Sequence, residues 1–219
     1  MLVITTQDGS HTLFNETLNE FYHSDKGAIQ ESKHVFVKDG LNYFSQSPIR
    51  IFEVGFGTGL NALLTMLEAE KQNLSIYYET IELHPLVIET IKELNYTQQL
   101  GYEFCYGPYH TLHLVRWNEE HQINKHFSFK KINSSLLTYT PQPSCFELIY
   151  FDAFSPEQQP EMWTKEVFRK MFDALVRNGI LVTYCSKVSV QQAMKEAGFT
   201  IDKLPGAPGK REMLRAHKK

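Results

Sequence analysis

The sequence predicts an α/β protein built on a doubly wound, mostly parallel sheet. Three observations carry this prediction. From residue 49 onward, apolar strand-like segments alternate with segments of helical periodicity. The first of these strands runs into a glycine-rich loop that opens a helix. Three of the strands end in an acidic residue, as expected where a ligand binds at the carboxyl edge of a parallel sheet.

The segment IRIFEVGFGTGLN joins the first strand to a helix N-terminus. Gly55, Gly57 and Gly59 recur at every second position, which lets the backbone turn sharply and bring its N–H groups against a ligand. Glu53 supplies a negative charge beside them. This pattern is typical of a nucleotide-cofactor site, although glycines between a strand and a helix often make only a turn.

Two further acidic strand ends strengthen the case for a ligand site. Glu82 ends the strand 74–82, roughly 20 residues or slightly more after the glycines, where the ribose of a nucleotide needs an acceptor for its hydroxyls. Asp152 ends the strand 146–152 and precedes Ala-Phe-Ser-Pro. Because ligands of open parallel sheets bind outside the carboxyl ends of the strands, Glu53, Glu82 and Asp152 are predicted to converge on one crevice.

The chain divides into two parts at the first strand of this unit. Residues 1–47 are predicted to form an N-terminal extension that covers one side of the crevice, and residues 48–219 form the ligand-binding domain. Asp8-Gly9 lies between two β-prone runs and predicts a hairpin. The other elements expected in the extension are a helix over 16–22, a turn over 24–27 and a short strand over 34–37.

The second part is predicted to alternate strands with helices. Its last two strands flank the sequence PGAPG and are expected to pair as a hairpin, and Asn178-Gly179 is expected to end the longest helix. The expected strands are one from residue 49, then 74–82, 126–132, 146–152, 179–185, 199–203 and 211–216, and the expected helices are 62–69, 85–95, a segment near 112–117, 161–176 and 188–197.

Length and composition are those of one soluble globular domain, with 219 residues and a formal net charge of −3. No apolar run approaches the ~20 residues of a membrane helix, and the N-terminus lacks the pattern of a secretory signal. Cys105, Cys145 and Cys185 are widely spaced and are predicted to be reduced, buried thiols of a cytoplasmic protein. No spacing of Cys or His indicates a metal. Residues 203–219 carry six Lys or Arg against one acid, as either a solvated terminus or an RNA-binding segment would.

Several motifs together resemble one enzyme family. These are ESKHVFV at 31–37, GFGTGLN at 55–61, DAFSP at 152–156, PEMW at 160–163, AGF at 197–199 and GKREML at 209–214. They are similar to the methyltransferases that complete 5-methylaminomethyl-2-thiouridine in tRNA, which occur alone or as half of a bifunctional protein. The resemblance implies a class I S-adenosylmethionine-dependent methyltransferase with a Rossmann-like, seven-stranded, mostly parallel sheet. It also implies that the substrate is the wobble uridine in the anticodon loop of tRNA, methylated on its 5-aminomethyl nitrogen.

The resemblance also implies what is absent. The FAD-dependent oxidase half of the bifunctional relatives has no room in this chain, so a separate enzyme is expected to supply the aminomethyl-uridine. Relatives carry an acidic residue for the adenine amino group where this chain has Lys131, which cannot accept a hydrogen bond. Either Asn133 or a backbone carbonyl is expected to substitute. Glu31 and His34 are placed near the site without an assigned role.

Site roles follow from the same resemblance. An alkylamine has a pKa of about 10, so a carboxylate must hold the ammonium and help remove its proton, and Asp152 is expected to do so. Asp152 could instead only cap the following loop. Phe154 would stack on the base or close off the methyl path. The cofactor contacts implied are Glu53, Gly55, Gly57, Gly59 and Asn61 for the methionine part and Glu82 for the ribose, and Lys210 and Arg211 are implied contacts to tRNA phosphate.

Three alternatives stay open from the sequence. Gly57-Thr-Gly-Leu-Asn-Ala62 fits G-x-G-x-x-A, which with Glu82 is compatible with an NAD-dependent oxidoreductase. The same fold could transfer a methyl or aminopropyl group to a small amine. A non-catalytic scaffold with a vestigial pocket is disfavoured because all three acidic strand ends are present.

Overall fold

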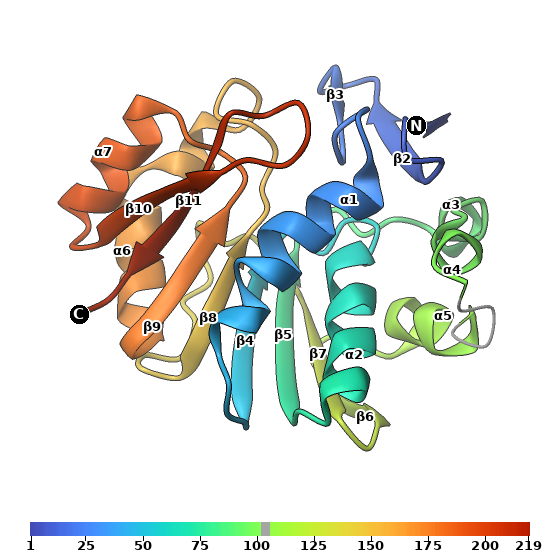
Figure 1. Cartoon of the computed structure of the whole chain (residues 1–219), viewed down its shortest axis with the longest axis horizontal. Helices are drawn as coiled ribbons and strands as arrows, with labels where there is room; N and C mark the ends of the chain where they lie inside the picture. The colour runs from blue at the N-terminus through green and yellow to red at the C-terminus, as the bar shows by residue number, and fades with distance from the viewer. Residues whose placement is uncertain (102–105) are drawn as a thin grey trace.

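The predicted alternation of strands and helices is present, and its strands join in one mixed sheet (Figure 1). The computed structural model describes residues 1–101 and 106–219. The five central strands are parallel, and antiparallel strands flank them at both edges. The order across the sheet is β10 (Thr200–Pro205), β11 (Glu212–His217), β9 (Leu175–Thr183), β8 (Phe146–Phe151), β4 (Ile49–Val54), β5 (Ile76–Glu82), β7 (Phe127–Asn133) and β6 (Glu120–Asn124).

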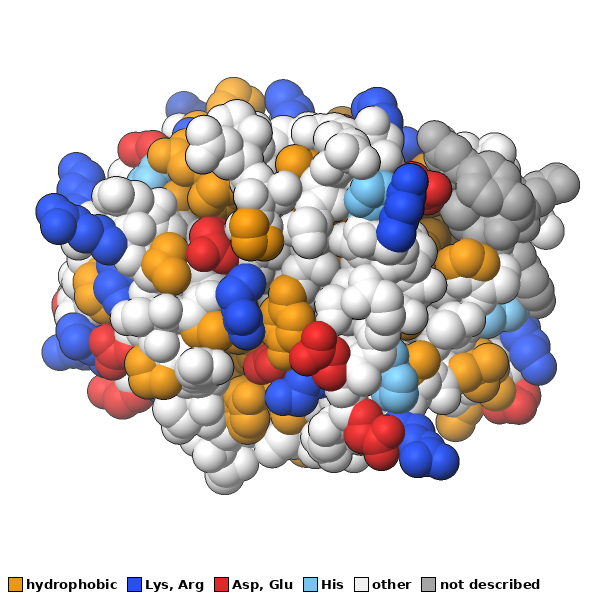
Figure 2. All heavy atoms as spheres, turned by 90° about the horizontal axis from the view of Figure 1, so that it is seen from below, with side chains coloured by type: hydrophobic (Ala, Val, Ile, Leu, Met, Phe, Trp, Pro, Cys, Tyr) orange, Lys and Arg blue, Asp and Glu red, His pale blue; other side chains and the backbone are white. Residues whose placement is uncertain are grey.

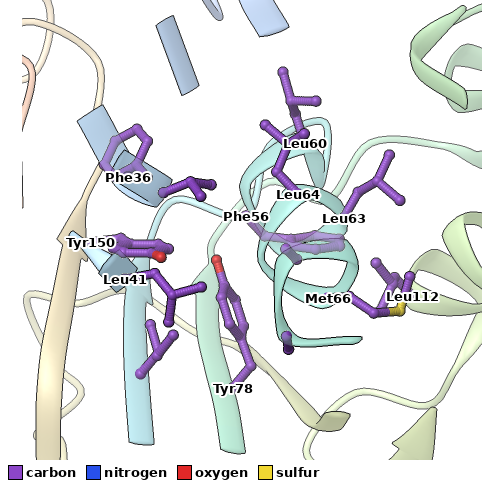
Figure 3. Packing of buried hydrophobic residues seen from close by; sticks show 14 of the residues in the cluster. Phe36, Leu41, Phe56, Leu60, Leu63, Leu64, Met66, Tyr78, Leu112 and Tyr150 are labelled. Carbon is purple, nitrogen blue, oxygen red and sulfur yellow. The ribbon is translucent and has the colours of Figure 1, made fainter. Parts of the chain in front are cut away.

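Helices cover both faces of this sheet because its strands are apolar on both sides. Side chains alternate along β4, so Ile49 and Ile51 enter one core and Phe52 and Val54 enter the other. Figure 3 shows part of the first core, where Tyr78 and Tyr150 face the helices. The first face carries α1 (Ala28–Ser32), the π-helix Lys33–Lys38, the 3-10 helix Leu41–Tyr43, α2 (Leu60–Gln72) and α5 (Tyr106–Leu114), and the second carries α6 (Lys165–Ala174) and α7 (Val188–Glu196).

The predicted N-terminal hairpin is confirmed. Its two strands pair antiparallel, and a third short strand extends them into a small separate sheet beside α1 (Figure 1). Asp8 stabilises the turn because its Oδ1 accepts hydrogen bonds from Ser10 N at 2.9 Å and Thr6 Oγ1 at 2.8 Å. The strands are β1 (Leu2–Thr5), β2 (His11–Asn15) and β3 (Glu20–Phe21).

Two predictions for the N-terminal part are wrong. Residues 16–22 form a turn that leads into β3 instead of a helix, because Asn15 Oδ1 accepts from Thr17 N and Leu18 N and stops regular structure there. Residues 34–37 form part of the π-helix instead of a strand. Their β-prone side chains pack on the sheet, with the rings of Phe36 and Tyr150 5.0 Å apart, so tertiary contact overrides local propensity.

The second part differs from prediction at several boundaries. The helix expected over 161–176 is a 3-10 turn at Pro160–Trp163 followed by α6, which Thr164 caps by accepting a hydrogen bond from Val167 N. Leu175 already has extended backbone and starts β9, so Asn178-Gly179 lies inside a strand. Asn178 has a φ of 64° where the register of β9 against β8 shifts, which indicates a bulge.

The segment after β5 also differs. The helix expected over 85–95 is shorter and starts later than Pro85, and the sheet has an eighth strand where seven were expected. The additional strand is the edge strand β6. Its residues are mostly polar, so the sequence shows no alternation of apolar and polar residues that would predict a strand. The helices here are α3 (Ile88–Lys92) and α4 (Tyr96–Gln99), and the helix expected near 112–117 is α5, which ends at Leu114.

Within the described part of the chain, no helix is both long and apolar enough to cross a membrane. Cys185 is buried and Cys145 partly buried, and both thiols are free, as expected. Cys105 lies outside the described residues. No group of three or more potential metal-ligating side chains occurs among residues 1–101 and 106–219.

Candidate active site

A cavity of about 930 Å³ lies at the carboxyl ends of β4, β5 and β8. Its lining comes from segments far apart in sequence: the N-terminal extension, the glycine loop and the segments after β5, β7 and β8, together with Tyr184 and Lys210. This is the edge at which open parallel sheets bind ligands, and the volume suits a cofactor-sized molecule. Of the predicted site residues, the cavity lining includes Gly55, Gly57, Asn61, Glu82, Asp152, Phe154 and Lys210.

The glycine loop lets two strand ends approach closely. Gly55 has a φ of 90°, and a Cβ built on it would lie 2.6 Å from the carbonyl oxygen of Asp152. Gly57 has a φ of 47°, and its Cβ would lie 3.1 Å from the ring of Tyr22. Only glycine combines this backbone with these contacts, so the loop both joins β4 to α2 and leaves its backbone facing the cavity.

Glu82 is held in place by the backbone around it. Its Oε2 accepts a hydrogen bond from Gly57 N at 3.1 Å, and its Oε1 accepts one from His84 N at 2.8 Å. A carboxylate has about four acceptor positions, so two remain for hydroxyl groups in the cavity. These two hydrogen bonds therefore hold both carboxylate oxygens of Glu82 between the glycine loop and the segment after β5.

Asp152 follows β8 directly and lies in the same cavity. Asn61, in the first turn of α2, donates from Nδ2 to Asp152 Oδ2 at 2.8 Å. Burial raises the pKa of Asp152 to about 7, and the hydrogen bond from Asn61 opposes this shift because it favours the charged form. The Glu31 charge raises this pKa further and the Lys210 charge lowers it. Asp152 is thus a carboxyl group that exchanges its proton near neutral pH.

Glu53 does not join the other two acidic strand ends. It shares the alternation phase of Ile49 and Ile51, so its side chain points under α2 and is fully buried behind the cavity wall. Burial, with a contribution from Asp152, raises the pKa of Glu53 to about 8. The polar side chains of Thr80, Tyr78 and Asn61 next to the carboxyl group oppose this shift in part. The expected convergence of three carboxylates in one crevice is therefore wrong for Glu53, and Gly59 also lies outside the lining.

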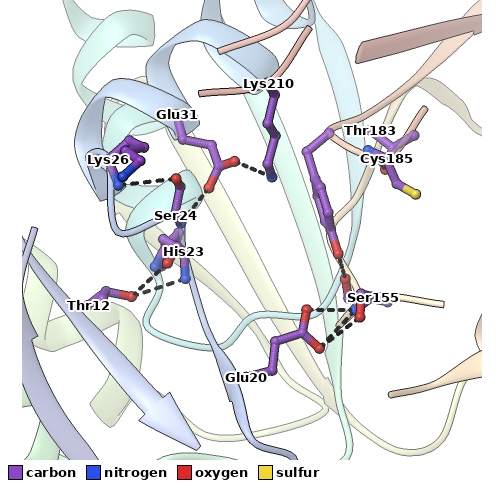
Figure 4. Close-up of polar contacts among 12 residues, drawn as sticks. Thr12, Glu20, His23, Ser24, Lys26, Glu31, Ser155, Thr183, Cys185 and Lys210 are labelled. Carbon is purple, nitrogen blue, oxygen red and sulfur yellow. Dashed lines mark hydrogen bonds and ion pairs between the residues drawn. The ribbon is translucent and has the colours of Figure 1, made fainter. Parts of the chain in front are cut away.

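Lys210 and Arg211 lie in different environments. Lys210, from the loop between β10 and β11, reaches into the cavity, where its Nζ lies 2.5 Å from Glu31 Oε1 (Figure 4). Glu31 Oε2 accepts from Ser24 N at 2.8 Å, so the carboxylate is bonded on both oxygens. Arg211 is exposed and outside the cavity lining. Sequence reasoning named Glu31 without a role and did not link it to Lys210, 179 residues away.

The N-terminal extension supplies lining residues that sequence reasoning missed. Glu20 accepts hydrogen bonds from the backbone N and the hydroxyl of Ser155, at 3.2 and 3.0 Å (Figure 4). Tyr22 meets Phe154 edge to face, with ring centroids 4.9 Å apart. Burial lowers the pKa of His23 to about 4, so this lining imidazole is neutral at pH 7. Glu20, Tyr22 and His23 precede the ESKHVFV block at 31–37 by a few residues. That block was the sequence signal that could have indicated their place near the site.

Residues 107–219 match a protein family described as S-adenosyl-L-methionine-dependent methyltransferase. The chain belongs to this family. The match covers more than half of the sequence and includes Asp152 and Lys210. S-adenosylmethionine is accordingly the methyl donor of this methyltransferase, which favours methyl transfer over the dehydrogenase alternative.

Two other comparisons extend along nearly the whole methyltransferase chain. A crystal structure of MnmC2 from Aquifex aeolicus superposes with a TM-score of 0.78 at 26% identity, covering 99% of this chain and 69% of that one. A tRNA 5-methylaminomethyl-2-thiouridine biosynthesis bifunctional protein MnmC from Leptospira interrogans is 30% identical over 217 residues, which cover 93% of this chain and 33% of that protein. Its counterpart from an Azoarcus species is 28% identical over 225 residues, with 95% and 34% covered.

The chain therefore spans about a third of the length of these two bifunctional relatives. A spermidine synthase from Thermotoga maritima, 14% identical with a TM-score of 0.53 over 96% of this chain and 69% of that one, shares the fold alone.

The residues of the cavity fit the methyl donor of this methyltransferase. The glycine loop exposes backbone beside Asp152, and Glu82 keeps acceptor positions free for ribose hydroxyls. Beyond Glu82, the lining becomes apolar at Leu83, Leu136 and Leu137, as a purine ring requires. The lining thus contains both polar groups, which suit an amino-acid group and ribose hydroxyls, and apolar side chains, which suit a purine.

Lys131 lies away from this adenine side. Its Nζ donates to His113 O at 2.5 Å and lies 4.5 Å from the centroid of the Trp117 ring, on the face of the sheet covered by α5. Asn133 Nδ2 donates a hydrogen bond to Glu82 O at 2.9 Å. The lining at this position is the segment 134–137. Neither Lys131 nor Asn133 is part of the cavity lining, so a backbone carbonyl remains the predicted acceptor for the adenine amino group.

Proposed function

We propose that this methyltransferase acts on tRNA, transferring a methyl group from S-adenosylmethionine to the 5-aminomethyl nitrogen of wobble 5-aminomethyl-2-thiouridine, which gives 5-methylaminomethyl-2-thiouridine. Asp152 carries this proposal: it is a cavity carboxylate, held by Asn61, whose pKa of about 7 suits exchange of a proton with an amine. The names of the bifunctional relatives, which refer to the biosynthesis of 5-methylaminomethyl-2-thiouridine in tRNA, support the same product.

The chemistry requires a neutral amine. A primary alkylamine is mostly protonated at pH 7, with an unperturbed pKa of about 10, and an ammonium has no lone pair to attack a methyl group. Asp152 binds the ammonium, orients it and accepts its proton, and the pKa of this carboxyl allows the proton to leave again near pH 7. The bound donor supplies an electrophilic methyl group on a sulfonium.

Other cavity residues complete this site. Gly55, Gly57 and Asn61 border the methionine part of the donor, and Glu82 accepts from the ribose hydroxyls. Phe154, supported edge to face by Tyr22, offers an aromatic surface to the uracil ring. Glu53 lies behind the cavity wall, where its charge and that of Asp152 influence each other.

The RNA contacts are expected to be local because the net charge of the chain is −3. On the face seen from below, which is away from the carboxyl ends of the parallel strands, acidic and basic side chains are interspersed (Figure 2). Arg211 is exposed next to Lys210, which enters the cavity, and is placed to meet a phosphate of the anticodon loop. We propose that a separate enzyme supplies the aminomethyl-uridine and that the reaction takes place in the cytoplasm.

The proposal is tested by incubating the protein with labelled S-adenosylmethionine and tRNA from cells that lack this enzyme, followed by nucleoside analysis. Label in 5-methylaminomethyl-2-thiouridine is the expected result. Donor binding without label in any nucleoside would overturn the tRNA substrate and direct the search to small amines, for which spermine and free amino acids serve as first candidates.

A further inference from the structure

Lys210 lines the same cavity as Asp152, and its contacts to Glu31 and Tyr184 hold its ammonium group. One side of the ammonium is bonded to Glu31 Oε1 at 2.5 Å. Another side faces the ring of Tyr184, whose centroid is 4.0 Å from Nζ. An ammonium has three N–H donors, and no further hydrogen bond of Nζ occurs within the described part of the chain. About a third of the side chain is exposed, and Lys210 is one of the residues that line the cavity.

Tyr184 links this ammonium to Asp152. Its ring carries Lys210 on one face, and its hydroxyl donates to Ala153 O at 3.0 Å, one residue from Asp152. Lys210, Tyr184 and Asp152 all line the same cavity, and Tyr184 lies between the other two through these contacts. The cavity therefore presents an acceptor and a donor on either side of Tyr184, held by the segments that follow β8 and β9 and by the loop before β11.

This arrangement matches one feature of the proposed substrate. In a 5-aminomethyl-uridine the amine is attached through one carbon to C5, and the neighbouring ring position C4 carries a carbonyl oxygen. The amine needs an acceptor and O4 needs a donor. A 5-aminomethyl-cytidine carries the same amine, but its C4 bears an amino group, which is a donor like Lys210.

We propose that Lys210 is the residue that selects uracil over cytosine, by donating a hydrogen bond to the O4 oxygen while Asp152 holds the adjacent amine. This inference rests on the proposed function and refines the role of Lys210 from a contact to phosphate to a contact with the base itself. Glu31 and Tyr184 hold the ammonium for this contact, since a free lysine side chain would lose much conformational freedom on binding.

A phosphate contact and a base contact differ in their consequences. A lysine bound to phosphate contributes equally to every substrate, whatever its base. A lysine that donates to O4 stabilises the uridine complex and opposes the cytidine complex, because two donors then face each other. The ratio of kcat/KM for the two bases therefore reports the role of Lys210, and the loss of a merely structural residue would leave that ratio unchanged.

The test uses two anticodon stem-loop RNAs that differ only at the wobble position, one with 5-aminomethyl-uridine and one with 5-aminomethyl-cytidine. Methyl transfer is measured for the full-length protein and for Lys210→Met, Lys210→Arg and Lys203→Met. Lys203 is a matched control because it lies on the same hairpin and also pairs with a glutamate, Glu212, at 3.3 Å. Thermal midpoints and donor affinity are recorded for each variant.

The native protein is expected to prefer the uridine RNA by roughly tenfold or more, as expected for a hydrogen bond with a charged donor. Lys210→Met is expected to bring the ratio close to one, whereas Lys210→Arg and Lys203→Met retain most of it. Because Lys210→Met leaves Glu31 unpaired and could impair folding, the double variant Glu31→Gln/Lys210→Met gives the same comparison with a neutral pair.

The outcomes separate the two proposals. A native protein inactive on the uridine RNA would overturn the proposed function. A native protein active on the uridine RNA but equally active on the cytidine RNA would overturn only the role of Lys210. An unchanged preference in Lys210→Met or in the double variant, with both rates reduced alike, would overturn it as well and would return Lys210 to a phosphate contact.

Discussion

Asn61 Nδ2 donates a hydrogen bond to Asp152 Oδ2 at 2.8 Å and so joins the first turn of α2 to the end of β8. The bond connects the glycine loop, which faces the donor, with the carboxyl group proposed to hold the amine. It stabilises the charged form of Asp152, whereas burial favours the neutral form. Asn61 therefore controls the pH at which the proposed proton acceptor becomes available.

Replacing Asn61 with Leu removes this donor at similar volume. The pKa of Asp152 is about 7 with the hydrogen bond present, and without it we expect the pKa to rise by on the order of one unit. The carboxylate is the active form, so activity is lost as pH falls through this pKa, and the midpoint of that loss moves to higher pH. Rates of methyl transfer between pH 5.5 and 9.5 measure it. An identical midpoint in the variant would contradict the coupling.

Asp152→Asn tests the carboxylate itself. The amide keeps the shape of the side chain but cannot accept a proton, so we expect kcat to fall by roughly 100-fold or more. Affinity for S-adenosylmethionine, measured by calorimetry, should stay within about threefold, since Asp152 is expected to contact the amine. Asp25→Asn is a matched control because Asp25 also lines the cavity but pairs with Lys26. Near-normal turnover in Asp152→Asn would remove Asp152 from the chemistry.

The buried carboxyl of Glu53 is expected to make the folded protein less stable as pH rises. Its pKa is about 8 in the folded protein and 4.5 when exposed, so the unfolded chain releases this proton at lower pH than the folded chain. The contribution of Glu53 to stability therefore falls as pH rises from 4.5 towards 8. Glu53→Gln removes the ionisable group, and we expect the free energy of unfolding to rise at pH 8 by on the order of 1–3 kcal/mol.

Urea unfolding at pH 4.5 and pH 8 measures this effect. The gain in the free energy of unfolding of Glu53→Gln should be confined to the higher pH. At pH 4.5 the carboxyl of Glu53 is protonated in the folded chain, so its ionisation lowers the stability of the native protein little. Glu166→Gln, a change of an exposed carboxyl on α6, serves as the control and should show no such pH dependence. An equal effect of Glu53→Gln at both pH values would show that packing, and not ionisation, is responsible.

Local sequence signals predicted the part of the site that depends on the ends of strands. Glu82 and Asp152 follow directly from the position of an acidic residue after an apolar run, and both line the cavity. Glu53 is also a strand residue, but it continues the phase of Ile49 and Ile51, which marks the buried face. Glu82 has the phase of the buried Ile76 and Tyr78 in β5, but it is the last residue of its strand, whereas Glu53 is followed by Val54 within β4. The position inside the strand, together with the phase, therefore keeps Glu53 behind the cavity.

Contacts between segments far apart in the chain could not be predicted from local sequence patterns. The run Val35-Phe36-Val37 favours a strand, and only its packing on Tyr150 explains the helix. Lys210 belongs to a basic C-terminal stretch that suggested a surface role, and only its pairing with Glu31 places it in the cavity. The same holds for Glu20 and Ser155, whose hydrogen bonds join the N-terminal extension to the loop after β8.

Lys170 is predicted to support the adenine side of the cavity from behind. From α6, its Nζ donates to the carbonyl oxygens of Leu136 at 2.9 Å, Leu137 at 2.7 Å and Tyr139 at 3.2 Å. Leu136 and Leu137 line the cavity beyond Glu82. Three carbonyls held by one ammonium fix the backbone of this segment, so Lys170 determines the shape of a wall that it does not itself line.

Lys170→Met keeps the length of the side chain and removes all three hydrogen bonds. We expect the Kd for S-adenosylmethionine to rise by roughly tenfold, whereas kcat at saturating donor stays within about twofold, because the amine site at Asp152 is unaffected. Lys165→Met, on the same helix but exposed, is the control and should change neither value. A fall in kcat without a change in Kd would contradict a role confined to the donor, and unchanged kcat and Kd would show that the segment holds its shape without Lys170.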